Sequence, residues 1–188
     1  MTRRLFFALP LAAVPFLWGV SADYAAARRK FDLIESGRVQ PGGRVTVSAP
    51  ELNAWVREQA RQAFPDGVRN PTVALGTASA TGSALVDFGK VRRAQGHAPG
   101  WLASKLLDGE RPVQVAVRLR SAGGRATVDV DSVEVSGVTI DGPLLDYLIR
   151  NYLLPNYPGA KIGEPFELGH RIERLEVRPA AFAVVFGK

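Results

Sequence analysis

A predicted β-hairpin constrains this fold more than any other feature of the chain. Between residues 113 and 119, apolar residues alternate strictly with polar or small ones, which is the period of a half-buried strand. Ala122-Gly123-Gly124 then supplies a hairpin turn. Because a lone hairpin is barely stable in water, further strands and helices are expected to cover its apolar face.

The return strand of this hairpin changes phase partway along. Val128 and Val130 share one face, whereas Val133 and Val135 share the other. The change falls at Asp131-Ser132. Either a β-bulge or a strand that crosses from one surface to another would produce it.

Two helices with apolar faces are predicted to provide the cover. Ser48 and Glu51 form a capping box with Pro50 in the first turn, and the helical pattern runs to Phe64. A second helix begins near Pro143. Its apolar residues form two i, i+4 rows, namely Leu144, Leu148 and Tyr152, and Leu145, Ile149 and Leu153.

The remaining predicted elements give an α+β order. Strands are expected at 72–79, 83–91, 166–177 and 180–186, with short helices at 25–34 and 101–108. Hairpins dominate this order, so an antiparallel sheet packed by helices is favoured. The chain divides into an N-terminal segment, 1–22, a connector, 23–43, and a single α+β domain, 44–188.

The N-terminal segment predicts an extracytoplasmic location. Arg3 and Arg4 precede an uncharged run, 5–22, that ends in the small residues Ser21 and Ala22, an arrangement typical of secretory signals. A cleaved signal peptide and a retained transmembrane anchor in the inner membrane both fit this pattern. The protein is therefore expected in the periplasm or elsewhere outside the cytoplasm.

Composition excludes several kinds of site. The chain has no cysteine, which removes disulfides, thiolate zinc sites, cysteine nucleophiles and lipoprotein acylation. The formal net charge of +6 favours anionic partners such as a lipid headgroup or an anionic membrane surface. Export makes nucleic acid the least favoured of the anionic partners.

The sequence contains no recognisable catalytic constellation. His97 and His170 lie beside turns without other ligating residues, and no zinc-hydrolase, nucleophile-elbow or phosphate-loop motif occurs. Asp129 and Asp131 share a strand face and could contribute to a metal site, although arginines are expected opposite them across the hairpin. We therefore expect a protein that is not an enzyme and that needs no cofactor. A metal-dependent hydrolase is the less favoured alternative.

The order of elements also suggests a family. Glu51-Leu52-Asn53 lies in the capped helix, valine-rich hairpins follow, and Gly137-Val138-Thr139-Ile140 leads into Leu144-Leu145 before two closing strands. Over residues 44–188 this pattern resembles small bacterial envelope proteins of the tubular lipid-binding, or TULIP-like, superfamily. The resemblance implies a strongly curved antiparallel sheet wrapped around a long helix, with a groove for an acyl chain.

A non-enzymatic envelope protein that binds a lipid or another long apolar molecule is thus the expected function. Arg118 and Arg120 are candidate headgroup contacts. The candidate cavity wall comprises Leu52, Trp55, Val56, Leu144, Leu148 and Tyr152. The alternative is a structural or assembly partner of another envelope protein, in which the same apolar faces fill a packed core.

Overall fold

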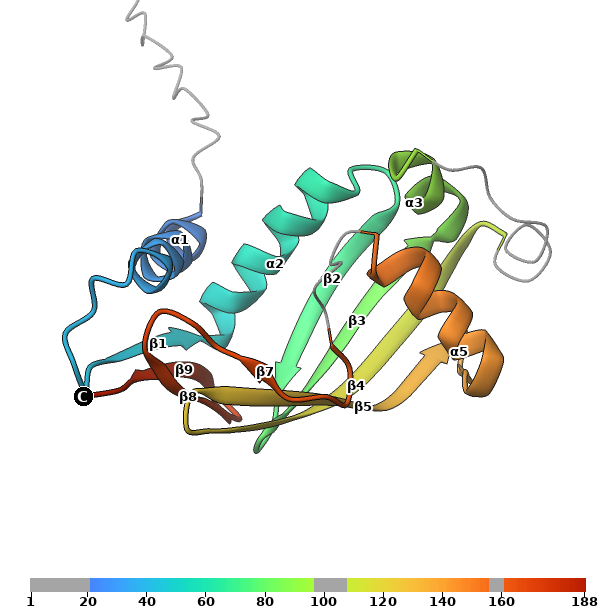
Figure 1. Ribbon diagram of the computed structural model, residues 1–188. Helices are drawn as coiled ribbons and strands as arrows, with labels where there is room; N and C mark the ends of the chain where they lie inside the picture. The colour runs from blue at the N-terminus through green and yellow to red at the C-terminus, as the bar shows by residue number, and fades with distance from the viewer. Residues whose placement is uncertain (1–20, 97–107, 156–160) are drawn as a thin grey trace, which may run out of the picture.

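Two antiparallel sheets carry the fold, and four α-helices accompany them in the computed structural model, which describes residues 21–96, 108–155 and 161–188. The helices lie on one side of the strands: α1 lies near the smaller sheet, α2 runs along an edge of the larger sheet, and α3 and α5 lie toward the far end of the larger sheet (Figure 1). The described chain is therefore α+β with antiparallel strands, as the sequence predicts.

The smaller sheet joins the two ends of the described chain. Its strand order is β1-β9-β8, comprising β1 (Arg44–Ser48), β9 (Ala181–Phe186) and β8 (Ile172–Arg178). Its β8 reaches the larger sheet, because the Leu175 amide donates to Ser121 Oγ at 2.9 Å and the Ala78 amide donates to the Val177 carbonyl at 3.0 Å.

The larger sheet contains the predicted hairpin. Its strands follow the order β2-β3-β4-β5-β6, with β7 also paired to β5. The bounds are β2 Val68–Leu75, β3 Ser79–Asp87, β4 Glu110–Ala122, β5 Arg125–Val135, β6 Val138–Thr139 and β7 Phe166–Glu167.

The phase change in the return strand is a β-bulge. Ala116 pairs with Ser132 and Val117 with Val130, so Asp131 is the extra residue. The bulge brings Val130 and Val133 to the same face of the sheet, since their partners Val117 and Val115 are two residues apart on β4. Of the two explanations that the sequence left open, the bulge is confirmed.

Helix α2 (Ala49–Ala63) begins at the predicted capping box. The Ser48 amide donates to Glu51 Oε2 at 2.7 Å, and the Glu51 amide donates to Ser48 Oγ at 3.4 Å. Asn53 then fixes the helix to strand β2. Its Nδ2 donates to the Val73 carbonyl at 2.9 Å, and its Oδ1 accepts from the Val73 amide at 2.8 Å.

Part of the segment 23–43 is packed against the sheets. Helix α1 (Ala22–Glu35) includes the predicted helix 25–34 and extends beyond it at both ends. Lys30 Nζ contacts the Glu51 carboxylate at 2.6 Å, and Ile34 joins a buried cluster with Val45 and Phe186. Ser21 caps α1 by accepting from the Tyr24 amide at 3.2 Å.

Three expected elements differ from the structure. The turn between the first two strands lies at residues 76–78, so β2 and β3 are shifted from 72–79 and 83–91, and residues 88–91 are helical. The reason is Asp87, which accepts from the Lys90 amide at 2.9 Å and starts α3 (Phe88–Ala94). The expected strand 166–177 is divided, because His170 and Arg171 adopt positive φ angles between β7 and β8.

The curved wrapping around a long helix is not shown by the described chain. The longest helix there, α2, has 15 residues, and the strands form two sheets rather than one. The expected helix 101–108 falls almost entirely outside the described residues, as does the N-terminal segment before Ser21. None of the helices in the described part has the length and apolar character needed to span a membrane.

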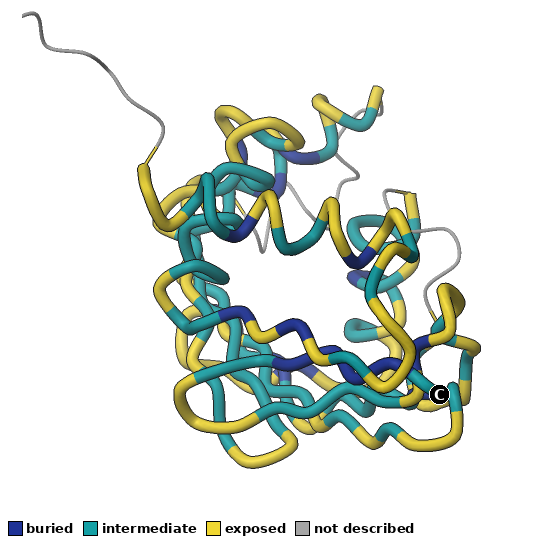
Figure 2. Tube along the Cα trace, turned by 90° about the vertical axis from the view of Figure 1, so that its left-hand side faces the viewer, coloured by how far each residue is buried: buried dark blue, intermediate teal, exposed yellow. Residues whose placement is uncertain are grey.

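Burial is uneven along the chain. One buried cluster lies under α1 and contains Ile34, Val45, Ile172, Val184 and Phe186. A second lies between the larger sheet and helix α5 (Gly142–Leu148) and contains Phe88, Val133, Val135, Ile140 and Leu148. In Figure 2 the buried positions form short stretches, separated by many half-buried ones.

Candidate ligand-binding pocket

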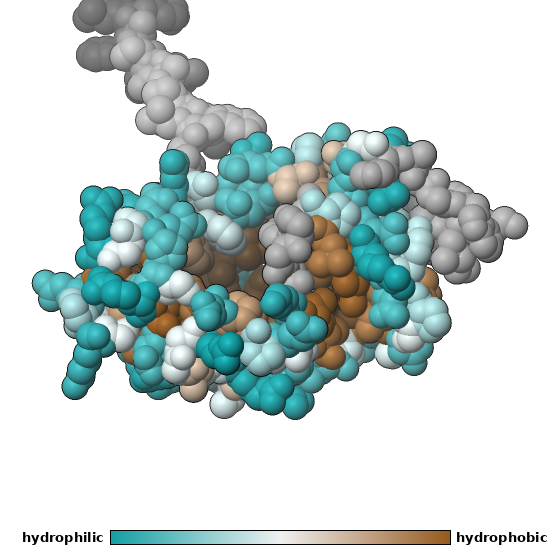
Figure 3. Space-filling view, in the orientation of Figure 1, coloured by the Kyte–Doolittle hydropathy of each residue, from teal (hydrophilic) through white to brown (hydrophobic). Residues whose placement is uncertain are grey.

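An apolar pocket lies between the inner face of the larger sheet and the helical segments α3, α5 and η1. Its volume is about 290 Å³. Fifteen of the described residues line it, all of them aliphatic or aromatic: Phe64, Val68, Val86, Phe88, Val91, Val113, Val115, Val130, Val133, Leu145, Leu148, Ile149, Tyr152, Leu153 and Ile162. Figure 3 shows hydrophobic surface set back between hydrophilic rims on this side of the molecule.

The sheet contributes valines because of its pleat. Val113 and Val115 lie two residues apart on β4, so both face the same side. On β5 the bulge at Asp131 restores the same side for Val130 and Val133. One sheet face thus presents short branched side chains, which leave room that larger residues would fill.

The opposite wall is a helix that changes type. Helix α5 (Gly142–Leu148) continues as the π-helix η1 (Ile149–Leu153), in which the Leu154 amide donates to the Ile149 carbonyl at 3.0 Å. A π-helical turn holds more residues than an α-turn. Residues from both predicted apolar rows therefore line the pocket, whereas Leu144 packs on the neighbouring buried cluster.

Helix α3 ties the π-helix down through polar side chains. Arg92 Nη1 donates to the Asn151 carbonyl at 3.1 Å, and Gln95 Nε2 donates to the Tyr152 carbonyl at 3.1 Å. The Arg92 guanidinium also lies 5.9 Å from the centre of the Tyr152 ring. These contacts hold Tyr152 in the pocket wall.

Aromatic contacts and burial determine the surroundings and the protonation state of the Tyr152 phenol. Its ring meets Phe88 edge to face, with centroids 5.1 Å apart, and lies 6.4 Å from the ring of Tyr147. Burial is the main reason that the pKa of Tyr152 is raised to about 12, with a further contribution from Tyr147. The phenol is therefore neutral at physiological pH.

The structure brings together part of the predicted cavity wall. Leu148 and Tyr152 line the pocket. Leu52, Trp55 and Val56 lie on α2 and do not, and Trp55 instead packs on Phe31 of α1 with ring centroids 4.5 Å apart. Sequence reasoning missed the valines of the sheet as cavity residues, although their alternation was the signal that places them on one face.

The two predicted headgroup arginines lie on the other face of the sheet. Arg118 contacts Asp131 at 3.2 Å and Arg120 contacts Asp129 at 2.8 Å. These pairs are the cross-strand contacts expected from the sequence. Both aspartates are thus engaged by arginines, away from the pocket.

Other candidate sites are sparse in the described chain. No group of three or more His, Asp or Glu residues is placed to hold a metal ion among residues 21–96, 108–155 and 161–188. His170 is exposed in a turn, and His97 lies outside the described residues.

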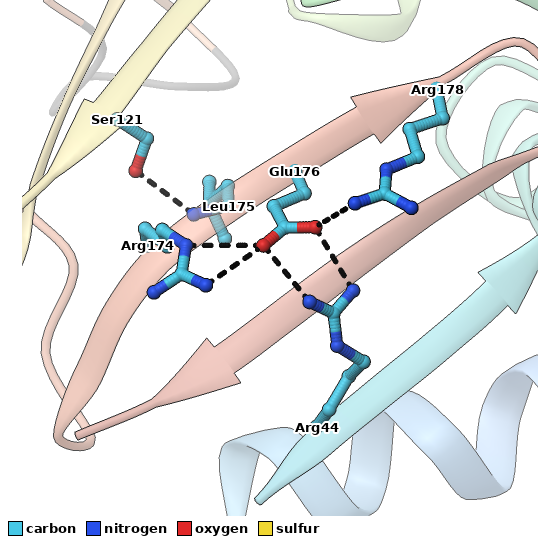
Figure 4. Close-up of polar contacts among 6 residues, drawn as sticks. All are labelled: Arg44, Ser121, Arg174, Leu175, Glu176 and Arg178. Atoms are coloured by element: carbon cyan, nitrogen blue, oxygen red, sulfur yellow. Dashed lines mark hydrogen bonds and ion pairs between the residues drawn. The ribbon is translucent and has the colours of Figure 1, made fainter. Parts of the chain in front are cut away.

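A basic cluster occupies the outer side of the smaller sheet (Figure 4). Glu176 accepts from both Nη atoms of Arg44 at 2.9 Å, and also contacts Arg174 and Arg178. Hydrogen bonding from Arg44 is the main cause that lowers the pKa of Glu176, followed by Arg174. Three guanidinium groups around one carboxylate leave this surface positively charged.

Comparison with known proteins does not assign a family. No protein-family model matches the chain, and no curated protein matches it.

Proposed function

We propose that this protein is a non-enzymatic component of the cell envelope that binds a lipid or another long apolar molecule in the pocket under the larger sheet. The observation that carries the proposal is the predominantly apolar lining that the described residues form between the sheet and η1. Clefts that bind small molecules are mostly apolar with few polar groups. This pocket fits that description, with a volume of about 290 Å³ that lies just below the usual range of about 300–1,000 Å³.

The energetics favour an aliphatic ligand. Each methylene transferred from water to an apolar site contributes about 0.8 kcal/mol. Aliphatic cavities of about 150 Å³ are known to stay dry and to bind an apolar guest. A pocket of about 290 Å³ can therefore hold an alkyl chain without any catalytic group.

The resemblance to TULIP-like proteins is part of this proposal. What supports it is an apolar pocket between an antiparallel sheet and a helix that follows Gly137–Ile140. The strongly curved sheet around a long helix belongs to the proposal only.

Location and surface partner are proposed on separate grounds. The basic start and uncharged run 5–22 support a periplasmic or other extracytoplasmic site, with or without a retained inner-membrane anchor. The Arg44, Arg174 and Arg178 cluster supports an anionic membrane surface as partner, because positive surface charge attracts anionic lipids. Fusion of residues 1–40 to alkaline phosphatase tests the location, and a stable but inactive fusion would contradict it.

Native mass spectrometry tests the binding function. The protein is purified from membranes without harsh detergent, and an adduct of lipid mass is expected. Ile149→Trp, which fills the pocket, should abolish the adduct, whereas Leu33→Trp on the exposed side of α1 should retain it. A bare polypeptide mass, together with no uptake of a fluorescent fatty acid by the folded protein, would favour the structural or assembly role instead.

A further inference from the structure

Three buried polar atoms without a hydrogen-bond partner lie on residues beside the pocket. They are Nε of Arg92, Oε1 of Gln95 and Nε of Arg111. Arg92 belongs to α3 and Gln95 is its C-cap residue, and both donate to backbone carbonyls of η1. Arg111 pairs with Val86 in the sheet and lies two residues before Val113, and both valines line the pocket.

Neither of the two guanidinium groups is paired with a carboxylate of the described chain, although Arg92 also donates to the Asn151 carbonyl and lies near the Tyr152 ring. In the described part of the chain, neither Arg92 nor Arg111 takes part in an ion pair, whereas Arg118 and Arg120 each face an aspartate. A partly buried cation without a counter-charge is costly. An unsatisfied buried donor in a native structure calls for an explanation, and a bound ion is one such explanation.

These observations point to the polar end of the ligand. We propose that the pocket takes a single-chain amphiphile with an anionic headgroup, whose oxygen accepts hydrogen bonds from Arg92 while Arg111 adds positive charge from the sheet side. This inference rests on the proposed lipid-binding function. The pocket volume of about 290 Å³ suits one alkyl chain better than two.

A matched pair of probes tests the inference. Binding of decanoate and of 1-decanol to the full chain is measured by isothermal titration calorimetry at pH 7.5, where the carboxylate is ionised. The two probes share the alkyl chain and differ in charge. We expect decanoate to bind at least about tenfold more tightly, since hydrogen bonds to charged groups are stronger than neutral ones.

Substitutions test which arginines cause the preference for decanoate over decanol. Arg92→Gln should reduce decanoate affinity about tenfold toward that of decanol, with decanol binding unchanged. Arg111→Gln should give a smaller loss, and Arg118→Gln and Arg120→Gln should give none. If Arg92→Gln weakens both probes, Arg92→Lys decides, because it keeps the charge: a retained preference for decanoate supports the inference, and a lost one opposes it.

The outcomes separate the two proposals. Equal affinity for decanoate and decanol in the unaltered protein, or a preference that survives both Arg92→Gln and Arg111→Gln, overturns the headgroup assignment while leaving lipid binding intact. Failure of both probes to bind the folded protein overturns lipid binding itself. If inorganic phosphate binds as tightly as decanoate, the arginines would form a site for a free anion, and the proposal of an amphiphilic ligand would be contradicted.

Discussion

The two ends of this molecule are built from similar residues and packed differently. At the α1 end, formed by α1, α2 and the smaller sheet, Val47 and Ala27 are fully inaccessible and Val184 and Phe186 are nearly so. At the pocket end, formed by α3, α5, η1 and the larger sheet, the apolar side chains leave a pocket of about 290 Å³. Because close packing supplies stability and a cavity sacrifices it, the comparison separates the part that holds the fold from the part that can bind.

Truncation of a core aromatic side chain should give the largest difference in stability between the two ends. Phe186→Ala is expected to lower the free energy of unfolding by about 3–5 kcal/mol, because it leaves a cavity in a filled core. Ile149→Ala at the pocket wall should cost about 1–2 kcal/mol, since this side chain already borders empty space. Urea unfolding followed by circular dichroism measures both, and equal losses would show that the two ends are packed alike.

Loss of the Asn53 contact between α2 and the larger sheet should have the second largest effect on stability. Asn53→Ala removes the hydrogen bonds to both backbone groups of Val73, at an expected cost of about 2 kcal/mol. Gln59→Ala on the same helix is the control and should change stability by less than about 0.5 kcal/mol. A small effect of Asn53→Ala would indicate that water replaces the amide without penalty.

Added volume should distinguish the two ends in the opposite direction. Val47→Leu inserts a methylene where no space exists and should destabilise by about 1.5 kcal/mol. Val115→Leu points the same addition into the pocket, so its cost should stay under about 0.5 kcal/mol while ligand capacity falls. Thermal unfolding of the two variants compares them. A penalty at Val115 as large as that at Val47 would contradict an open pocket.

Acid should weaken the α1 end by the smallest expected amount. Partial burial acts to raise the pKa of Glu51, but hydrogen bonds from Lys30 and Ser48 outweigh it and hold the pKa below its ordinary value of 4.5. A lowered folded-state pKa stabilises the protein above the ordinary value, and this contribution is lost as the pH falls through the folded value. Hydrogen-exchange protection factors, which correct for the slower intrinsic exchange of amides in acid, should therefore fall in residues 22–63 below pH 4.5.

A charge-neutral variant isolates that contribution. Glu51→Gln should already show the lower protection factors at pH 7, and its protection should respond less to acid than that of the unaltered chain. Exchange at the pocket end should follow the same pH profile in both proteins. A pH response that Glu51→Gln leaves intact would assign it to other carboxylates.

Local patterns predicted the fold where neighbouring residues decide it. The capping box at Ser48 and the hairpin around Gly123 depend on contacts within a few residues, and both are confirmed. The bulge was one of two explanations for a phase change, and only the register of β4 could choose between them. At residues 88–91 the sequence analysis expected a strand to continue, but the N-cap at Asp87 starts a helix there instead.

The pocket was less predictable because it depends on long-range packing. From helical spacing alone, α2 and the helix formed by α5 and η1 have similar apolar faces, so the sequence could not tell which of them lines a pocket. Helix α1 covers part of the former through Phe31 and Trp55, while η1 turns the latter toward the sheet. Arg92 carried no sequence signal, since its position beside the pocket follows from how α3 meets η1.

The Asn53 contact also bears on self-association. Strand β2 is an edge of the larger sheet as the described residues show it, and unpaired backbone groups at such an edge can recruit a strand from another molecule. At Val73 both groups are already engaged by the amide of Asn53, so α2 occupies the place that a second chain would take. The same side chain that attaches a helix thus helps to keep this edge from acting as a template for aggregation.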